Sequence, residues 1–156
     1  MSQFRLASFV LFVKDPAVSK KFYQDYLSQE IAMDLGVNVG FTSGLALWQE
    51  DYARNVIFGE PGEKSTGKNV EVYFEVDAIE DVFAHMKTHD IEFIHDLKEQ
   101  PWSQRVFRIY DPDRFIVEIA ESMPNVVQRL HTSGMEFDDI VKKTYMPPEI
   151  VSQMMA

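Results

Sequence analysis

Apolar and polar positions fall into short runs whose spacing predicts strands and helices in a repeated order. Residues 5–13, RLASFVLFV, form a nearly continuous apolar run of strand length. Asp15 and Pro16 follow, and because Asp is a favoured N-cap and Pro is tolerated at the first helical position, a helix is predicted from here to Leu27. Short runs broken by glycines over residues 31–49 predict three further strands, a β-meander.

The same order of elements returns after a segment rich in glycine, proline and charge. That segment, residues 53–68, has little apolar weight and is predicted to be a linker. Residues 70–76 then alternate as a strand does, and Asp77 stands where a second cap is expected before a helical stripe. Residues 105–110 and 115–120 flank an Asp-Pro-Asp-Arg turn and predict an antiparallel hairpin. The predicted order is βαβββ, linker, βαβββ, and an internal duplication is the simplest explanation.

The C-terminal residues 122–156 lie outside this duplication. Proline and glycine positions predict three helices there, in an arrangement similar to a DNA-binding helix-turn-helix. The segment holds three basic and four acidic residues, and its third helix has no basic residue to meet a phosphate, which argues against DNA binding. We expect its apolar side chains to pack on the main domain or on a second subunit. The predicted domain spans residues 1–121, with module one at 4–52 and module two at 69–121.

Composition and charge narrow the functional classes. A chain of 156 residues, 46% hydrophobic and 26% charged, fits one globular domain with a proper core. No stretch approaches the roughly 20 apolar residues that span a bilayer, and the N-terminus lacks the order of a secretory signal. The absence of cysteine excludes disulfides and thiolate metal sites. We expect a cytoplasmic protein with no membrane partner, whose charge of -10 disfavours nucleic acid as a partner and favours a cationic ligand or simply solubility.

Two segments carry a resemblance to a known family. FVLFVKDPAVSKKFYQDYL and PWSQRVFRIYDPDRFIVEIAE resemble the opening strand and helix and the closing hairpin of the vicinal oxygen chelate (VOC) superfamily, which includes glyoxalase I, bleomycin resistance proteins and extradiol dioxygenases. The likeness covers residues 4–121 in order. It implies an α+β fold in which two βαβββ modules form curved mixed sheets around a cleft, followed here by a helical extension. Relatives commonly pair, so a homodimer is expected.

The resemblance also implies metal positions, one on the first and one on the last strand of each module. Carried over by distance from the strand ends, these fall at Ser8 and Glu71 on the first strands and at Glu118 on the last; the remaining position falls near Leu47, Trp48 or Gln49. With histidine absent from both first strands, the set is oxygen-only and suits magnesium, manganese or calcium better than zinc or nickel. The candidate metal ligands are Glu71, Glu118 and Gln49. Alternatively, the two carboxylates are salt-bridge partners of Arg105 or Arg108.

Strand alternation indicates which side chains face the expected cleft. Glu71, Tyr73 and Glu75 share one face of their strand, while valines on the other face pack under a helix. Each tryptophan could stack on a ligand or plug the core, and Arg108 could clamp an anionic group or pair with Glu118. The candidate ligand-binding residues are Ser8, Trp48, Tyr73, Glu75, Trp102 and Arg108, and the candidate catalytic residues are Glu71 and Glu118.

Three functions are compatible with these residues. An acidic, tyrosine-lined cleft and the missing histidines favour a small-molecule binder of unknown ligand, similar to the bleomycin resistance proteins. The alternative is a lyase, isomerase or transferase in which Glu71 and Glu118 hold a divalent metal, although ordinary glyoxalase I activity is disfavoured without the histidines. A third hypothesis is a regulatory module that couples ligand binding to the C-terminal helices.

Overall fold

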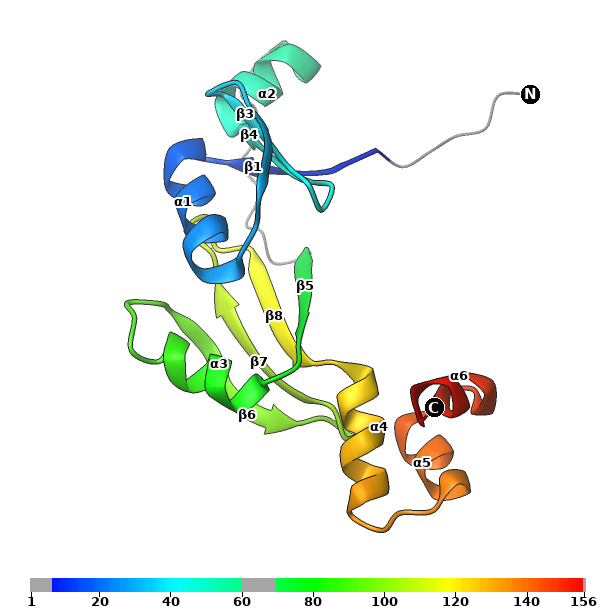
Figure 1. Cartoon of the computed structure of the whole chain (residues 1–156). Helices are drawn as coiled ribbons and strands as arrows, with labels where there is room; N and C mark the ends of the chain where they lie inside the picture. The colour runs from blue at the N-terminus through cyan, green and yellow to red at the C-terminus, as the bar shows by residue number, and fades with distance from the viewer. Residues whose placement is uncertain (1–6, 60–69, 156) are drawn as a thin grey trace, which may run out of the picture. The chain divides into compact units, whose positions relative to one another are not determined.

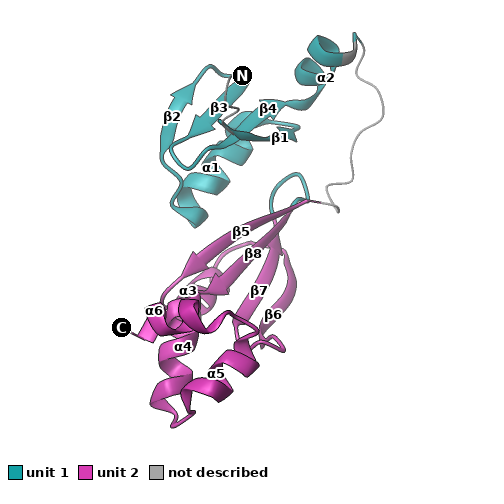
Figure 2. Ribbon diagram, turned by 90° about the vertical axis from the view of Figure 1, so that its right-hand side faces the viewer, with its two compact units in different colours: residues 1–69, 111–115 teal, residues 70–110, 116–156 magenta. Residues whose placement is uncertain are grey.

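The computed structural model describes residues 7–59 and 70–155, which divide between two compact units (Figure 2). Unit 1 comprises Met1–Asn69 with the turn Asp111–Phe115, and unit 2 comprises Val70–Tyr110 with Ile116–Ala156. Each unit holds one four-stranded mixed sheet with helices, so the predicted α+β class is confirmed. No helix within these described ranges is long and apolar enough to cross a membrane.

Unit 1 contains the first βαβββ set. Its sheet has the order β1-β4-β3-β2, with β1 parallel to β4 and the other pairs antiparallel. The three strands predicted between residues 31 and 49 are all present. The elements are β1 (Phe9–Val13), α1 (Pro16–Leu27), β2 (Ile31–Asp34), β3 (Asn38–Phe41), β4 (Leu45–Gln49) and α2 (Glu50–Phe58) (Figure 1).

Helix α1 begins where the sequence predicts. The Asp15 side chain accepts hydrogen bonds from the backbone N–H groups of Ala17 (2.9 Å) and Val18 (3.4 Å), which satisfies two free donors of the first turn. The buried face of α1 includes Tyr23, which is fully buried and donates a hydrogen bond to Asp111 (3.0 Å). The turn Asp111–Phe115 is therefore part of the packing of α1.

Helix α2 is a correction to the predicted linker. Residues 53–58, expected to be irregular, belong to this helix, and residues 60–69 lie outside the described ranges. The Gln49 side chain caps the helix by accepting from the N–H of Tyr52 (2.6 Å), and Gly59 ends it with a φ of 79°. The local capping signals thus outweigh the weak apolar content of the segment.

Unit 2 repeats the same arrangement. Its sheet has the order β5-β8-β7-β6, with β5 parallel to β8 and the other pairs antiparallel, which matches the order in unit 1. Helix α3 packs on β7 and β8. The predicted hairpin is confirmed as β7 and β8. The elements are β5 (Glu71–Val76), α3 (Ile79–Met86), β6 (Phe93–Glu99), β7 (Arg105–Tyr110) and β8 (Ile116–Glu121).

The predicted cap at Asp77 is wrong. The N-cap of α3 is Ala78, and it makes no side-chain cap bond. Asp77 instead accepts hydrogen bonds from Ser122 Oγ (2.8 Å) and from Asn125 Nδ2, which reaches both its side chain (3.4 Å) and its backbone carbonyl (2.7 Å). Tertiary contacts with the start of the C-terminal helices therefore replace the local cap.

The three predicted C-terminal helices are present as α4 (Met123–Thr132), α5 (Phe137–Thr144) and α6 (Pro148–Met155). They follow β8 at one end of the sheet (Figure 1). Their apolar side chains form a small core of their own, which partly buried methionines surround. The sequence predicts packing on the main domain or on a second subunit, and the second alternative stays a prediction. The core residues are Val126, Val127, Leu130, Ile140 and Val151.

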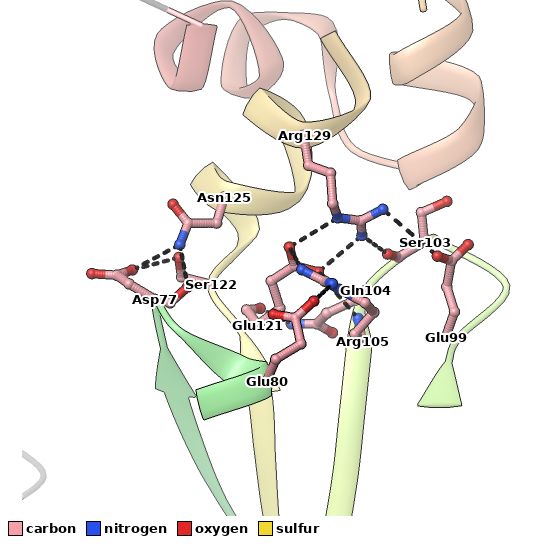
Figure 3. Close-up of polar contacts among 10 residues, drawn as sticks. All are labelled: Asp77, Glu80, Glu99, Ser103, Gln104, Arg105, Glu121, Ser122, Asn125 and Arg129. Carbon is pink, nitrogen blue, oxygen red and sulfur yellow. Dashed lines mark hydrogen bonds and ion pairs between the residues drawn. The ribbon is translucent and has the colours of Figure 1, made fainter. Parts of the chain in front are cut away.

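A buried ion-pair network joins these helices to the sheet (Figure 3). Glu121, only 1% exposed at the end of β8, accepts paired hydrogen bonds from Arg105 of β7 (3.0 and 2.8 Å) and from Arg129 of α4 (3.0 and 2.9 Å). Arg129 also donates to the Ser103 carbonyl (2.6 Å). Burial favours a raised pKa for Glu121, but the hydrogen bonds from Arg105 and Arg129 outweigh it and lower the pKa to about 2. Glu121 is thus the ionic anchor of α4.

Gly134, between α4 and α5, gives a simple stability prediction. Its φ is 91°, a conformation that costs a side-chain-bearing residue about 1 kcal/mol, so Gly134→Ala should lower the free energy of unfolding by that amount. Gly40 lies within β3 with no positive φ, and an added methyl group there meets nothing within 4 Å. Gly40→Ala should therefore leave the free energy of unfolding unchanged or raise it. Urea titration of both variants measures the two effects. Equal effects of the two substitutions would contradict this assignment.

Candidate functional site

Four polar side chains lie in register across the sheet of unit 2. Tyr73 of β5 is opposite Glu118 of β8, Glu118 is opposite Arg108 of β7, and Arg108 is opposite His95 of β6. Directly opposite residues on paired strands point to the same face of a sheet. We call Tyr73, Glu118, Arg108 and His95 the polar row.

The polar row lies on the sheet face opposite α3. Phe107, adjacent to Arg108 along β7, packs its ring on Phe83 of α3 with 5.2 Å between ring centroids. Successive strand residues point to opposite faces, so Arg108 points away from α3. Glu71 and Glu75 flank Tyr73 at two-residue spacing and share its face, and exposure alternates along β5 as the sequence predicts. The expected acidic, tyrosine-bearing face is therefore present.

Arg108 is the most connected member of the polar row. Its Nε donates to Glu71 Oε2 (2.8 Å), its Nη1 lies 3.2 Å from His95 Nε2, and its Nη2 forms an ion pair with Glu118 Oε2. His95 Nδ1 lies 2.8 Å from the Asp96 carbonyl oxygen, which can only accept a hydrogen bond, so we assign the ring proton to Nδ1. Nε2 then accepts a hydrogen bond from Arg108. The predicted Arg108–Glu118 pair is present, and Arg108 binds Glu71 as well.

Glu118 is a carboxylate near the centre of a sheet. It is 4% exposed and lies on β8, between β5 and β7. Burial raises its pKa above the usual value; the Arg108 charge opposes this shift, and the negative charge of Glu71 adds to it. Glu118 Oε2 makes no hydrogen bond of ordinary geometry, but its ion pair with Arg108 means that it is not unpaired.

Tyr73 belongs to a chain of hydrogen bonds at the edge of this face. Its hydroxyl donates to Glu75 Oε1 (2.7 Å) and accepts from Gln104 Nε2 (2.9 Å). Gln104 Oε1 in turn accepts from the indole N–H of Trp102 (2.9 Å), so Trp102 uses its polar atom within the protein. Burial and the bond to Glu75 raise the pKa of Tyr73 to about 12. The hydroxyl is therefore neutral at physiological pH, and the side chain remains 48% exposed.

The three other candidate residues belong to unit 1, and the polar side-chain atoms of two of them, Ser8 and Gln49, have partners in that unit. Ser8 Oγ donates to the Gly44 carbonyl (2.9 Å), and the Gln49 amide caps α2. The Trp48 ring packs edge-on against Phe12, with 6.1 Å between centroids. Their predicted roles in ligand or metal binding stay predictions.

Glu71 and Glu118 face a guanidinium, which would have to move before a divalent ion could lie between their Oε2 atoms. Oxygen ligands of magnesium, manganese and calcium must direct lone pairs at the ion, but Glu71 and Glu118 each direct one oxygen, Oε2, at Arg108. Within residues 7–59 and 70–155, no group of three or more histidine and carboxylate side chains is arranged to hold a metal.

Sequence reasoning missed two residues of this site. His95, for which the sequence pattern offers no partner, contacts Arg108 across an irregular β6–β7 pairing with register shifts on both sides of it. Gln104 is buried and connects Tyr73 and Trp102 to the Glu121 carbonyl (2.9 Å). Neither contact has a local sequence signal, because both depend on which strands pair and in what register.

Comparisons with known proteins agree with this topology. The sequence profile of the glyoxalase-like domain matches residues 6–124. A crystal structure of a protein of unknown function from Agrobacterium tumefaciens str. C58 is 34% identical, with 79% of this chain and 98% of that chain covered and a TM-score of 0.71. A search of curated proteins found no significant match.

Two further solved structures are similar at lower identity. A lactoylglutathione lyase from Agrobacterium tumefaciens is 21% identical, covering 74% of this chain and 91% of that chain with a TM-score of 0.60. A glyoxalase/bleomycin resistance protein/dioxygenase from Nocardioides is also 21% identical, covering 78% of this chain and 85% of that chain with a TM-score of 0.61. These likenesses concern the fold. Because the profile match extends over most of the chain, the protein belongs to the glyoxalase-like domain family, within the VOC superfamily that its sequence resembles.

Proposed function

We propose that the protein binds a small molecule bearing a cationic or hydroxyl group, on the face of unit 2 that carries the polar row. The observation that carries this proposal is the position of Glu118. A buried carboxylate costs free energy even when it is paired, and an apolar residue of similar volume is often at least as stable. The other β8 positions of that face, Ile116 and Ala120, are apolar. The fold alone therefore does not require a glutamate there.

The charge of the face supports the class of ligand. Across the four strands, this face presents three carboxylates, those of Glu71, Glu75 and Glu118, against the two positive charges of Arg108 and of Lys98, which is opposite Val106 of β7. The excess of negative charge favours a cationic group. Tyr73 adds a neutral hydroxyl that is half-exposed and already held in place by Glu75 and Gln104. A hydroxyl-bearing ligand could hydrogen-bond to it without displacing either neighbour.

A thermal-shift screen with primary and quaternary amines, amino sugars and diols tests this proposal. A compound that binds only the folded protein raises its melting temperature in proportion to occupancy. Glu118→Gln and Tyr73→Phe should each weaken such a compound about tenfold or more, as expected for loss of a charged or well-placed hydrogen bond. Glu149→Gln, a matched removal of one charge from α6, should leave the affinity unchanged.

The same screen distinguishes metal-free binding from the hypothesis of a metal-dependent enzyme. Binding that persists with a chelator supports the metal-free binder proposed here. Binding that requires added manganese or magnesium, or that is equally strong in Glu118→Gln, would overturn the proposal in favour of a metal-dependent activity or a site elsewhere.

A further inference from the structure

We infer that the guanidinium of Arg108 occupies the position between Glu71 and Glu118 where the family resemblance implies a divalent metal. Its positive charge takes the place of the metal ion in unit 2. The inference concerns only residues of unit 2. It stands whether or not the proposed ligand is found, because its test uses metal ions alone.

The first step is the geometry of the guanidinium. Its three nitrogens are directed at three different side chains: Nε at Glu71 (2.8 Å), Nη1 at His95 (3.2 Å) and Nη2 at Glu118. These partners come from β5, β6 and β8, so Arg108, on β7, connects all four strands of the sheet. The planar fork of arginine suits such divided hydrogen bonding, whereas the compact ammonium of lysine would act as a point charge.

The second step is electrostatic. Two carboxylates directed at one partly buried point repel each other, and a positive charge between them removes most of that cost. A divalent ion and a guanidinium can each supply this positive charge. They exclude each other here because an ion bound between the Oε2 atoms of Glu71 and Glu118 would have to lie where the guanidinium lies.

The third step is the role of His95. A histidine beside two carboxylates would ordinarily be a candidate metal ligand, since neutral imidazole nitrogens bind transition metals. Its Nε2 instead faces Arg108, and its Nδ1 faces the Asp96 carbonyl. All three side chains that could ligate an ion at this position therefore direct one polar atom at the guanidinium.

Removing Arg108 should create a cation site. In Arg108→Ala, the melting temperature should fall, and added Mn²⁺ should restore part of it in a saturable manner, with direct Mn²⁺ binding visible by electron paramagnetic resonance. The wild-type protein should show neither a thermal shift nor saturable binding over the same Mn²⁺ concentrations. Arg108→Gln, which is neutral but can still hydrogen-bond to both carboxylates, is the second variant if Arg108→Ala folds poorly.

Two controls separate the proposed site from general effects. Arg108→Lys keeps a positive charge and should not gain Mn²⁺ binding. The double variant Arg108→Ala/Glu118→Gln should lose whatever Arg108→Ala gains. Saturable Mn²⁺ binding by wild type that Glu118→Gln abolishes, or a folded neutral variant with no Mn²⁺ response, would overturn the inference.

Discussion

Replacing Glu121 by glutamine should destabilise unit 2 by about 3–5 kcal/mol, the range expected when one partner of a buried ion pair is removed. Glu121 accepts two hydrogen bonds from each of two arginines and is 1% exposed. A glutamine would turn an amide N–H₂ toward guanidinium donors and would leave Arg105 and Arg129 without their shared counter-ion. For a chain of this size the melting temperature should fall by about 2–4 °C for each kcal/mol.

The fluorescence of Trp102, followed in a Trp48→Phe background, measures this effect. The chain has two tryptophans, and Trp102 is the one in unit 2. Glu99→Gln is the matched control, since Glu99 also pairs with Arg129 (3.6 Å) but its side chain is 49% exposed, and an exposed pair contributes about 0–1 kcal/mol. If the two substitutions had equal effects, Glu121 would not be the anchor of α4.

The pH dependence of this pair has a defined sign. The folded-state pKa of Glu121, about 2, lies below its ordinary value of 4.5. The unfolded chain therefore binds the proton first, so the stabilisation is present above about pH 4.5 and is lost as the pH falls toward 2. Glu121→Gln should lack this acid-dependent loss.

Asp111 should show a pH dependence opposite in sign to that of Glu121, and Asp111→Asn should stabilise unit 1 by about 3 kcal/mol at pH 8, because the Asp111 pKa is raised from 3.8 to about 6 in the folded protein. Burial raises the pKa of Asp111 from 3.8 to about 6, although the N–H groups of Phe115 and Asp113 and the Tyr23 hydroxyl oppose the shift. The folded protein keeps a proton that the unfolded chain releases, so this contribution is complete below about pH 4 and is lost as the pH rises through 6. The two proteins should therefore be equally stable at pH 4.

Asparagine suits this position because it preserves the hydrogen bonds. Asp111 Oδ1 accepts from the N–H groups of Asp113 (2.9 Å) and Phe115 (2.8 Å), and an amide oxygen can accept both. The Tyr23 hydroxyl, which donates to Oδ2, can instead accept from the amide nitrogen. Trp48 in a Trp102→Phe background reports on unit 1.

Tyr23→Phe is the control for this second prediction. It removes a donor that favours the carboxylate, so it should raise the pKa of Asp111 further and steepen the loss of stability at neutral pH. A flat profile in wild type between pH 4 and 8, or a destabilised Asp111→Asn at pH 8, would contradict the assignment.

Most of the architecture could be predicted because its signals are local. Asp15 and Pro16 specify the start of α1, alternation specifies β5, and proline positions specify the starts of α4 and α6. Helix α2 was missed because its apolar content is low and its N-cap, Gln49, is not a favoured capping residue, although Gly59 is an ordinary signal for a helix end.

Other features were not predictable because they depend on contacts between residues far apart in the sequence. Asp77 looks like a cap, but it binds Ser122 and Asn125, which are more than 40 positions away. Tyr23 is buried because Asp111, 88 positions away, satisfies its hydroxyl. No periodicity within a helix or strand contains that information.

The candidate site was predictable in its residue types but not in its geometry. Strand alternation placed Glu71, Tyr73 and Glu75 on one face, and the resemblance singled out Glu118. The position of Arg108 between two carboxylates depends on the register of three strand pairs, two of them regular and one irregular. The expected cleft, the homodimer and the roles of Ser8, Trp48 and Gln49 stay predictions.

The most direct test of the proposed ligand face is amide chemical-shift mapping by NMR, with the strongest compound from the thermal-shift screen, in the presence of EDTA. The shifts should centre on Tyr73 of β5 and Glu118 of β8, and they should disappear in Glu118→Gln. Shifts confined to α4–α6 or to unit 1, or shifts that vanish when EDTA removes divalent ions, would contradict a metal-free ligand site on the polar row.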